Sequence, residues 1–184
     1  MILTKQFLNE KVKTRILDEN LKFQKRQELD AYDVFISYSW NDRSFAYKVV
    51  ELLENCGYTV YVDYNDLKLD RSKVDEETAK RLVKKMKKCK ALFYIYSPSS
   101  SVSKWCPWEV GVFSGIKNFR CANLPIVDKS TDEYKNQEYL ELYPHIEYAK
   151  IAGKNEYDFW VHETEEKYVI LNAWLNGTRP FIHK

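Results

Sequence analysis

One carboxylate in the middle of the chain is placed where it could act on a bound ligand. Glu109 ends the segment 105–109 (WCPWE), which follows an apolar run at 91–96 and a serine-rich stretch. This order predicts a strand, a loop and a helix, with Pro107 tolerated in the first turn and Trp105 and Glu109 on one face. The helix dipole there keeps a carboxylate ionised, which suits stabilisation of positive charge better than proton donation. The alternative is a solvated acid beside two core tryptophans.

Composition describes a single globular domain and argues against several classes of site. The chain has 184 residues, 45% hydrophobic and 30% charged, which is enough for one substantial core. A net charge of +2 gives no reason to expect a nucleic-acid partner. With five glycines and no GxGxxG or Walker A sequence, a nucleotide would have to be held by side chains and helix ends. The scattered histidines and cysteines predict neither a metal site nor a histidine-dependent triad.

The amino-terminal residues contain no apolar core of a signal peptide, and no run of eighteen apolar residues occurs. We therefore expect no membrane span, no secretion by a visible signal, and a cytoplasmic protein with reduced thiols.

The elements that must position Glu109 follow from the periodicity of apolar residues. Residues 1–30 predict an amphipathic helical extension packed on a domain that comprises 31–184. Asp42 is expected to cap one helix of that domain, and Gly57 to end it. The expected strands lie at 32–38, 58–62, 91–96 and 122–127, and the helices between them at 42–55, 74–88 and 106–117. The tail is expected to add a short helix at 138–143, a final strand at 158–161 and a helix at 168–176.

Alternation of strands and helices predicts an α/β fold with a flavodoxin-like, mostly parallel five-stranded sheet in the order 2-1-3-4-5. Helices should cover both faces through right-handed crossovers. In that order ligands bind between the first and third strands, outside their carboxyl ends. The loop 37–41 should then lie beside 97–104 and Glu109, so that separate segments line one crevice.

Three segments together resemble a TIR (Toll/interleukin-1 receptor) domain over roughly residues 31–127. They are DVFISY at 33–38, GYTVYVD at 57–63 and the WxxxE pattern at 105–109. The loop 64–73 lacks the Arg-Asp and Pro-Gly pairs that receptor-type members often carry. With the segment 104–111 it looks more like stand-alone bacterial TIR proteins, including the TIR subunits of the Thoeris antiphage system.

That resemblance implies an enzyme that consumes NAD as a substrate and needs no cofactor. Cleavage of the nicotinamide–ribose bond builds positive charge on the ribose, as in glycoside hydrolysis. Glu109 would be the catalytic carboxylate that binds ribose hydroxyls and stabilises this charge. The expected products are nicotinamide and either ADP-ribose or a cyclic ADP-ribose, acting in antiphage defence by NAD depletion or as a signal to a downstream effector.

Five further side chains near the crevice are candidates for contact with NAD. Tyr38, Trp40 and Trp105 could stack on nicotinamide or adenine, with core packing as the alternative for each. Ser37 and Ser39 could bond to ribose or phosphate oxygens, with local capping of the turn as the alternative.

The loop 63–73 supplies three more candidates. Asp63 could touch the site from the end of a strand, and Arg71 or Lys73 could meet the pyrophosphate, with a turn role and solvated charges as the alternatives. TIR enzymes that this chain resembles commonly complete the pocket with a neighbouring subunit. We therefore expect self-association through TIR–TIR contacts, with this loop reaching across.

Two other functions remain open. The first is a non-enzymatic TIR module that signals by self-association or partner docking, in which Glu109 serves packing. The second is an enzyme like the nucleoside deoxyribosyltransferases, which also use a glutamate on an N-glycosidic bond.

Overall fold

The computed structural model describes residues 1–12, 29–62, 75–97, 100, 103, 105–129 and 138–183. Its strands are β1 Leu3–Thr4, β2 Tyr32–Ser37, β3 Val60–Val62, β4 Cys89–Tyr96, β5 Cys121–Val127, β6 His145–Lys150, β7 Tyr157–His162, β8 Lys167–Ile170 and β9 Phe181–Ile182. Its α-helices are α1 Lys5–Lys11, α3 Arg43–Asn55, α4 Glu76–Lys87, α5 Trp105–Ile116 and α6 Leu171–Leu175, and its 3₁₀ helices are η1 Trp40–Asp42 and η4 Glu138–Leu142.

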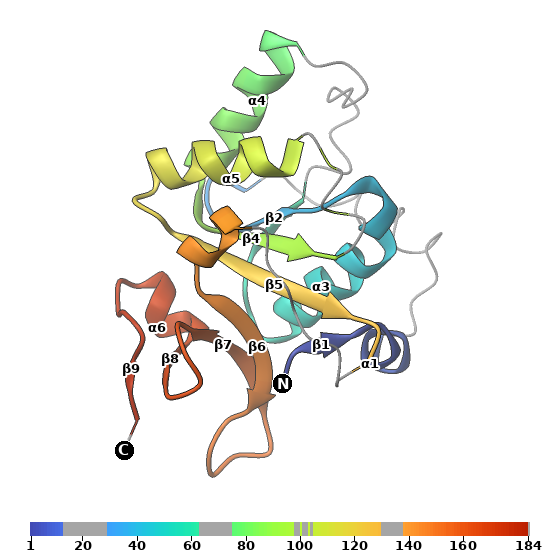
Figure 1. Ribbon diagram of the computed structural model, residues 1–184, viewed down its shortest axis with the longest axis vertical. Coiled ribbons are helices and arrows are strands. Elements are labelled where there is room, and N and C mark those ends of the chain that lie inside the picture. Colours follow the sequence, from blue (N-terminus) through green and yellow to red (C-terminus); the bar gives the residue numbers. More distant parts are fainter. Residues whose placement is uncertain are drawn as a thin grey trace.

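The described strands form one nine-stranded sheet in the order β3-β2-β4-β5-β6-β7-β8-β9, with β1 paired to β5 (Figure 1). The pairs from β3 to β6 are all parallel. Numbered along the chain from β2, these five strands have the order 2-1-3-4-5, so the predicted doubly wound arrangement is confirmed. The unbroken apolar centre of β2, residues 34–36, is fully buried, as a central strand covered on both faces requires.

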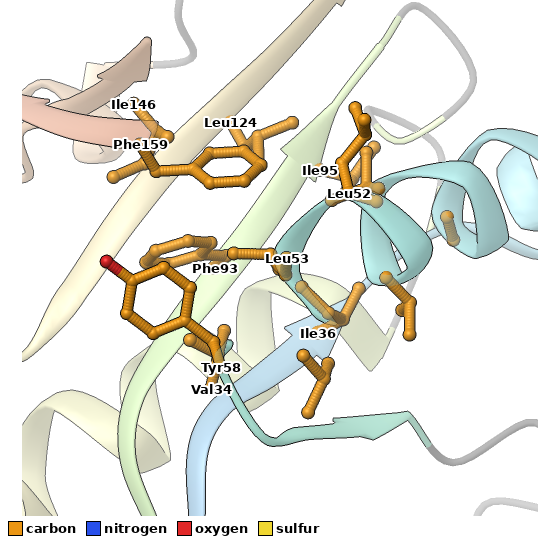
Figure 2. Close-up of a cluster of buried hydrophobic side chains, with 14 of the residues drawn as sticks. Val34, Ile36, Leu52, Leu53, Tyr58, Phe93, Ile95, Leu124, Ile146 and Phe159 are labelled. Atoms are coloured by element: carbon orange, nitrogen blue, oxygen red, sulfur yellow. The ribbon is translucent and has the colours of Figure 1, made fainter. Parts of the chain in front are cut away.

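Two hydrophobic clusters cover the two faces of the sheet. The first joins β2, β4 and β5 to α1, α3 and α6, and it includes Val34, Phe93 and Leu53 (Figure 2). The second lies under α4, α5 and η4 and includes Phe35 and Phe113. Because side chains alternate along a strand, Phe35 and Ser37 of β2 face α5, whereas Val34 and Ile36 face α3. This alternation decides which side chains at the end of β2 reach the helix that carries Glu109.

The carboxyl-terminal part differs from the sequence expectation. The fifth parallel strand is β6, which follows η4 directly, and the expected final strand at 158–161 is β7, antiparallel to it. The expected helix at 168–176 begins as strand β8 and becomes helical only at Leu171. Together with β9, these strands extend the sheet beyond the five expected members. Strands of two to six residues with partly exposed faces give too weak a periodicity to be found from sequence.

The amino-terminal segment contributes a strand as well as a helix. β1 pairs with the end of β5, and the backbone N–H of Tyr148 in β6 donates to the carbonyl oxygen of Met1. Helix α1 follows and buries Leu8 in the first cluster, while residues 13–28 lie outside the described chain. The division into segments 1–30 and 31–184 stays a prediction. Within the described residues, no helix combines the length and apolar character needed to cross a bilayer.

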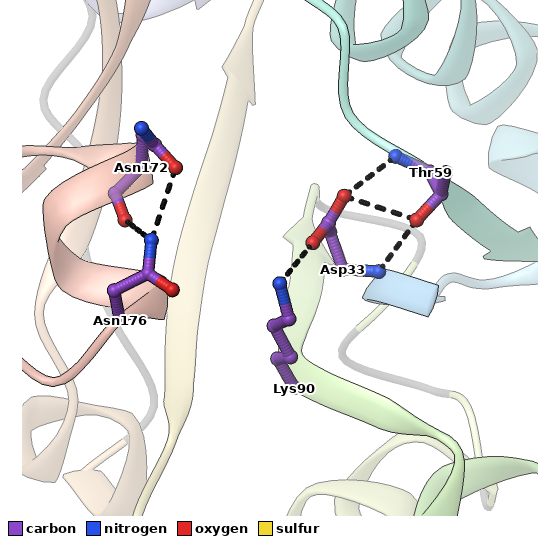
Figure 3. Close-up of polar contacts among 5 residues, drawn as sticks. All are labelled: Asp33, Thr59, Lys90, Asn172 and Asn176. Atoms are coloured by element: carbon purple, nitrogen blue, oxygen red, sulfur yellow. Dashed lines mark hydrogen bonds and ion pairs between the residues drawn. The ribbon is translucent and has the colours of Figure 1, made fainter. Parts of the chain in front are cut away.

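The amino ends of the central strands are tied together by a polar cluster (Figure 3). Asp33 in β2 accepts hydrogen bonds from the backbone N–H and hydroxyl of Thr59, and pairs with Lys90 of β4 at 2.8 Å. Burial opposes ionisation of this carboxyl, but the hydrogen bonds from Lys90 and Thr59 outweigh it and lower the pKa of Asp33. This edge is therefore closed by structural contacts, and the opposite, carboxyl edge carries the candidate chemistry.

Candidate active site

Glu109 reaches the carboxyl edge of the sheet because α5 runs back along β2. The ring of Phe113 lies 6.4 Å from that of Phe35, one helical turn and two strand residues away from the pair formed by Glu109 and Ser37. The helix and the strand thus meet twice, with apolar contact in the middle of the strand and polar contact at its end. The alternation of β2 places Ser37, and not Tyr38, on this face.

The polar contact is a buried hydrogen bond between Ser37 and Glu109. The Ser37 hydroxyl donates to Glu109 Oε2 at 2.5 Å, and both residues are 0% exposed. The alternative of a solvated acid is therefore wrong. The helix begins at Trp105, so Glu109 lies beyond its first turn, and the expectation of a first-turn carboxylate is corrected. A carboxylate excluded from water acts on nearby charge more strongly than a solvated one.

A second serine–carboxylate pair lies at the same edge, one strand over. Ser97, directly after β4, donates from its hydroxyl to Asp42 Oδ2 at 2.5 Å, and both side chains are buried. Ser97 also exchanges backbone and side-chain hydrogen bonds with Ser100. Asp42 makes no capping bond to α3, so the expected capping role is corrected. Its carboxylate instead ties η1 to the end of β4.

Trp40 is displayed at the surface of this edge. Its side chain is 60% exposed, so the core-packing alternative is excluded for Trp40. The guanidinium carbon of Arg43, in the first turn of α3, lies 4.9 Å from the centre of its indole ring. This is a cation–π pair, and it places a positive charge beside an exposed aromatic surface.

The remaining described candidates have more structural surroundings. Tyr38 is buried in the first hydrophobic cluster, which favours packing over contact with a ligand. Ser39 is buried before η1 and makes no side-chain capping bond. Trp105 is partly buried against the second cluster, where its ring meets that of Trp108 edge-on at 5.4 Å. Asp63, Arg71 and Lys73 lie outside the described residues.

The phenols beneath α5 stay protonated at neutral pH. Burial raises the pKa of Tyr94 in β4 and, to a lesser extent, that of Tyr139 in η4. Neither hydroxyl therefore adds a charge to the second hydrophobic cluster. In the described part of the chain, no three His, Cys, Asp or Glu side chains are arranged to hold a metal ion.

Two cavities lie away from this edge. One of about 370 Å³ runs along α4 beside Lys80 and Lys84, and one of about 330 Å³ lies between α1 and the β6–β7 hairpin, beside Phe7 and Tyr148. Neither is lined by Glu109 or Trp40. We assign the site to the carboxyl edge because a buried carboxylate, an exposed aromatic ring and a cation all lie at that edge of the sheet.

Sequence reasoning overlooked three residues at this edge, namely Asp42 as a buried tie, its partner Ser97, and Arg43. The position of Asp42 before a helical pattern is typical of a helix cap, so its burial was not predicted. Arg43 stands three residues after Trp40, a spacing at which side chains on a helical turn can meet, and this was the available signal.

The fold and this edge define a doubly wound α/β domain with two buried carboxylates, Asp42 and Glu109, at the switch point of its sheet. Residues 34–163 match a family model described as TIR domain. The chain belongs to the TIR-domain family.

Two bacterial proteins are similar to this chain in sequence. A Bacillus cereus (strain MSX-D12) protein named "Probable 3′ cyclic ADP-D-ribose synthase ThsB′" is 42% identical over 146 residues, 78% of this chain and 75% of that protein. A Cytobacillus dafuensis protein named "Putative cyclic ADP-D-ribose synthase TIR2" is 29% identical over 101 residues, 53% of this chain and only 27% of that protein. The TIR domain of the Toll-related receptor TRR-2 of Hydra magnipapillata, a solved structure, is 18% identical, with a TM-score of 0.45 over 60% of this chain and 78% of that one.

Proposed function

We propose that this protein cleaves the nicotinamide–ribose bond of NAD and converts the remainder into a cyclic ADP-ribose. The observation that carries the proposal is Glu109, a carboxylate buried at the carboxyl edge of a parallel sheet and held there by Ser37. The sequence similarity of this chain to two proteins named as cyclic ADP-D-ribose synthases supports the choice of reaction.

Glu109 would act as an electrostatic stabiliser and not as a proton donor. Departure of neutral nicotinamide leaves positive charge on the ribose, and a fixed carboxylate lowers the energy of that state. No general acid is needed, because nicotinamide leaves without a proton. Glu109 is fully buried, so the ribose can contact it only after neighbouring side chains move aside.

Trp40 and Arg43 would bind the other end of the dinucleotide. An exposed indole offers a face on which adenine can stack, and the adjacent guanidinium can pair with the pyrophosphate. The amino terminus of α3, at Arg43, adds the favourable end of a helix dipole. This assignment gives the pyrophosphate a cation within the described residues, in addition to Arg71 and Lys73 from the sequence analysis.

The cyclic product would depend on holding adenine close to the ribose. Once nicotinamide leaves, water and a nucleophile on the adenosine half of the substrate compete for the same carbon. An adenine stacked on Trp40 has the advantage of proximity, and a site closed to water favours it further. A product of this kind would serve as a signal for a downstream effector, with antiphage defence as the biological setting proposed from the resemblance to Thoeris TIR subunits.

A non-enzymatic interaction module is the second candidate, and the burial of Glu109 is the observation that favours it. A glutamate with 0% exposure and a serine partner can be retained for packing alone. Cleavage of NAD distinguishes the two candidates, because only the enzyme releases nicotinamide.

The experiment is incubation of the purified full chain with NAD over a range of protein concentrations, with chromatography of the products. We expect release of nicotinamide and a second product that separates from linear ADP-ribose. Nicotinamide with only linear ADP-ribose would contradict cyclisation. Absence of nicotinamide at every protein concentration would contradict the enzyme and favour the interaction module.

A further inference from the structure

The carboxyl edge contains two serine–carboxylate pairs of the same chemistry. In each, a hydroxyl at or just after the end of a central strand donates to a buried carboxylate at 2.5 Å. The pair of Ser97 and Asp42 joins β4 to η1, while the pair of Ser37 and Glu109 joins β2 to α5. Only the pair of Ser37 and Glu109 includes the carboxylate to which we assign the reaction. The pair of Ser97 and Asp42 therefore serves as a control for the loss of a serine–carboxylate hydrogen bond.

Ser37 holds its hydroxyl in a fixed position. It is the last residue of β2, a strand paired on both sides, and its Cα partner across the sheet is Tyr94 of β4. The side chain is 0% exposed, and its parity in the strand directs it to α5. Glu109 projects from a helix through three rotatable bonds, so its carboxylate needs an anchor if it is to hold one orientation.

The bond to Ser37 acts on one oxygen of the carboxylate, because the Ser37 hydroxyl donates to Oε2 of Glu109. A hydrogen bond donated to a charged group also favours the charged form, which is the form that stabilises positive charge.

We propose that Ser37 is a positioning residue, which fixes the Glu109 carboxylate for the ribose and does not itself contact NAD. This inference rests on the proposed function. It revises the sequence expectation that Ser37 binds ribose or phosphate oxygens directly.

The test compares kcat and KM for nicotinamide release in three variants of the full chain. Ser37→Ala removes the anchor, and we expect kcat to fall about 10- to 100-fold with KM within about threefold of wild type, because hydrogen bonds to charged groups contribute about 1.5–3 kcal/mol. Ser37→Thr keeps the hydroxyl and should recover most of the lost kcat. Ser97→Ala removes the matching bond to Asp42 and should leave kcat within about threefold, although it lowers the melting temperature.

The outcomes separate this inference from the proposed function. A wild type that releases no nicotinamide overturns both. If the wild type is active but Ser37→Ala and Ser97→Ala have the same kcat, this inference alone is overturned. A Ser37→Ala variant with raised KM and unchanged kcat also overturns it, because that pattern means that Ser37 contacts the substrate directly. If Ser37→Ala does not fold, Ser37→Cys, which is close in size but a weak donor, is measured against the same expectation.

Discussion

At the scale of single residues, the candidate catalytic and binding side chains at the carboxyl edge differ in solvent exposure. Glu109 is buried and anchored, whereas Trp40 is displayed with Arg43 against it. In the proposed reaction the buried group acts on the ribose and the exposed pair holds the adenine end. A change at Glu109 should therefore affect whether the bond breaks, and a change at Trp40 should affect what happens afterwards.

Replacing Trp40 by alanine should change the products more than the rate of bond cleavage. Loss of the indole removes the stacking surface for adenine, worth roughly 1–3 kcal/mol per base, so the adenosine half of the substrate attacks less often and water more often. Chromatography should show a larger share of linear ADP-ribose. Phe119→Ala is the matched control, because Phe119 is 59% exposed and lies beyond the far end of α5. An unchanged product ratio for Trp40→Ala would contradict the stacking role.

At the scale of elements, the end of α3 requires a backbone conformation that glycine adopts without strain. Gly57 has φ +89°, in the left-handed region expected of a glycine that ends a helix, and an added Cβ would meet no atom within 4 Å. Gly57→Ala should lower the free energy of unfolding by about 1–2 kcal/mol through strain alone. Gly115→Ala is the opposite case, since this exposed glycine lies within α5 and also has open space around it, and it should raise stability by about 0.5–1 kcal/mol.

Urea unfolding of the two glycine variants checks this pair. Equal effects of the two substitutions would contradict the account of how α3 ends.

The elements of the parallel half could be predicted from sequence, and those of the carboxyl-terminal half could not. Residues 34–36 are apolar without interruption and 43–55 have a regular helical stripe, so pattern alone located β2 and α3. The run Lys167–Ile170 continues directly into α6 with no turn residue between them, which concealed β8 within an expected helix. Its strand conformation is imposed by pairing with β7, a contact between segments that local sequence does not reveal.

The candidate site, like the fold, could be predicted from sequence only in part. Glu109, Ser37 and Trp40 could be assembled at one edge because strand order brings their segments together. The bond between Ser37 and Glu109 depended on the register of α5 against β2, which sequence spacing does not define. The burial of Asp42 likewise depended on where β4 ends, so a residue typical of a helix cap became a tie between elements.

At the scale of the whole molecule, all three histidines lie in the carboxyl-terminal part of the chain, from β6 onward, where their rings form a stack with Tyr168. His145 and His162 are cross-strand partners with ring centres 5.3 Å apart, and Tyr168 lies between His162 and His183. Glu147 lies beside the first two histidines. The contact between His145 Nε2 and Glu147 Oε1, at 3.7 Å, lowers the pKa of Glu147 to about 2 despite burial, with the amino terminus of Met1 contributing.

Acidification from pH 8 to pH 5 should therefore destabilise the fold through His162. Burial lowers the pKa of His162 below its ordinary 6.5, although Glu147 opposes this. The unfolded chain then binds more protons than the folded chain as the pH falls through 6.5, so the free energy of unfolding decreases. Melting temperatures should fall more for wild type than for His162→Gln. Parallel curves for the two proteins would contradict the assignment to His162.

Catalysis should also depend on assembly. The described part of the site, from Trp40 to Glu109, is one edge of a sheet, and ligand sites usually bury most of a ligand's surface. A head-to-tail contact between copies would supply the missing wall and can propagate into a filament. Specific activity should therefore rise with protein concentration, together with mass measured by light scattering. Constant specific activity across about a hundredfold dilution, with a monomer throughout, would contradict this expectation.

The central claim is that the carboxylate of Glu109 performs the reaction, and Glu109→Gln tests it most directly. The amide keeps the shape and can still accept a hydrogen bond from Ser37, but it removes the charge. Nicotinamide release should fall by about 10²–10³ while the melting temperature stays close to that of wild type. Asp158→Asn, which alters a half-buried carboxylate bonded to the Tyr58 hydroxyl, should keep wild-type turnover. A folded Glu109→Gln variant with more than about a tenth of wild-type turnover would show that Glu109 is not the catalytic group.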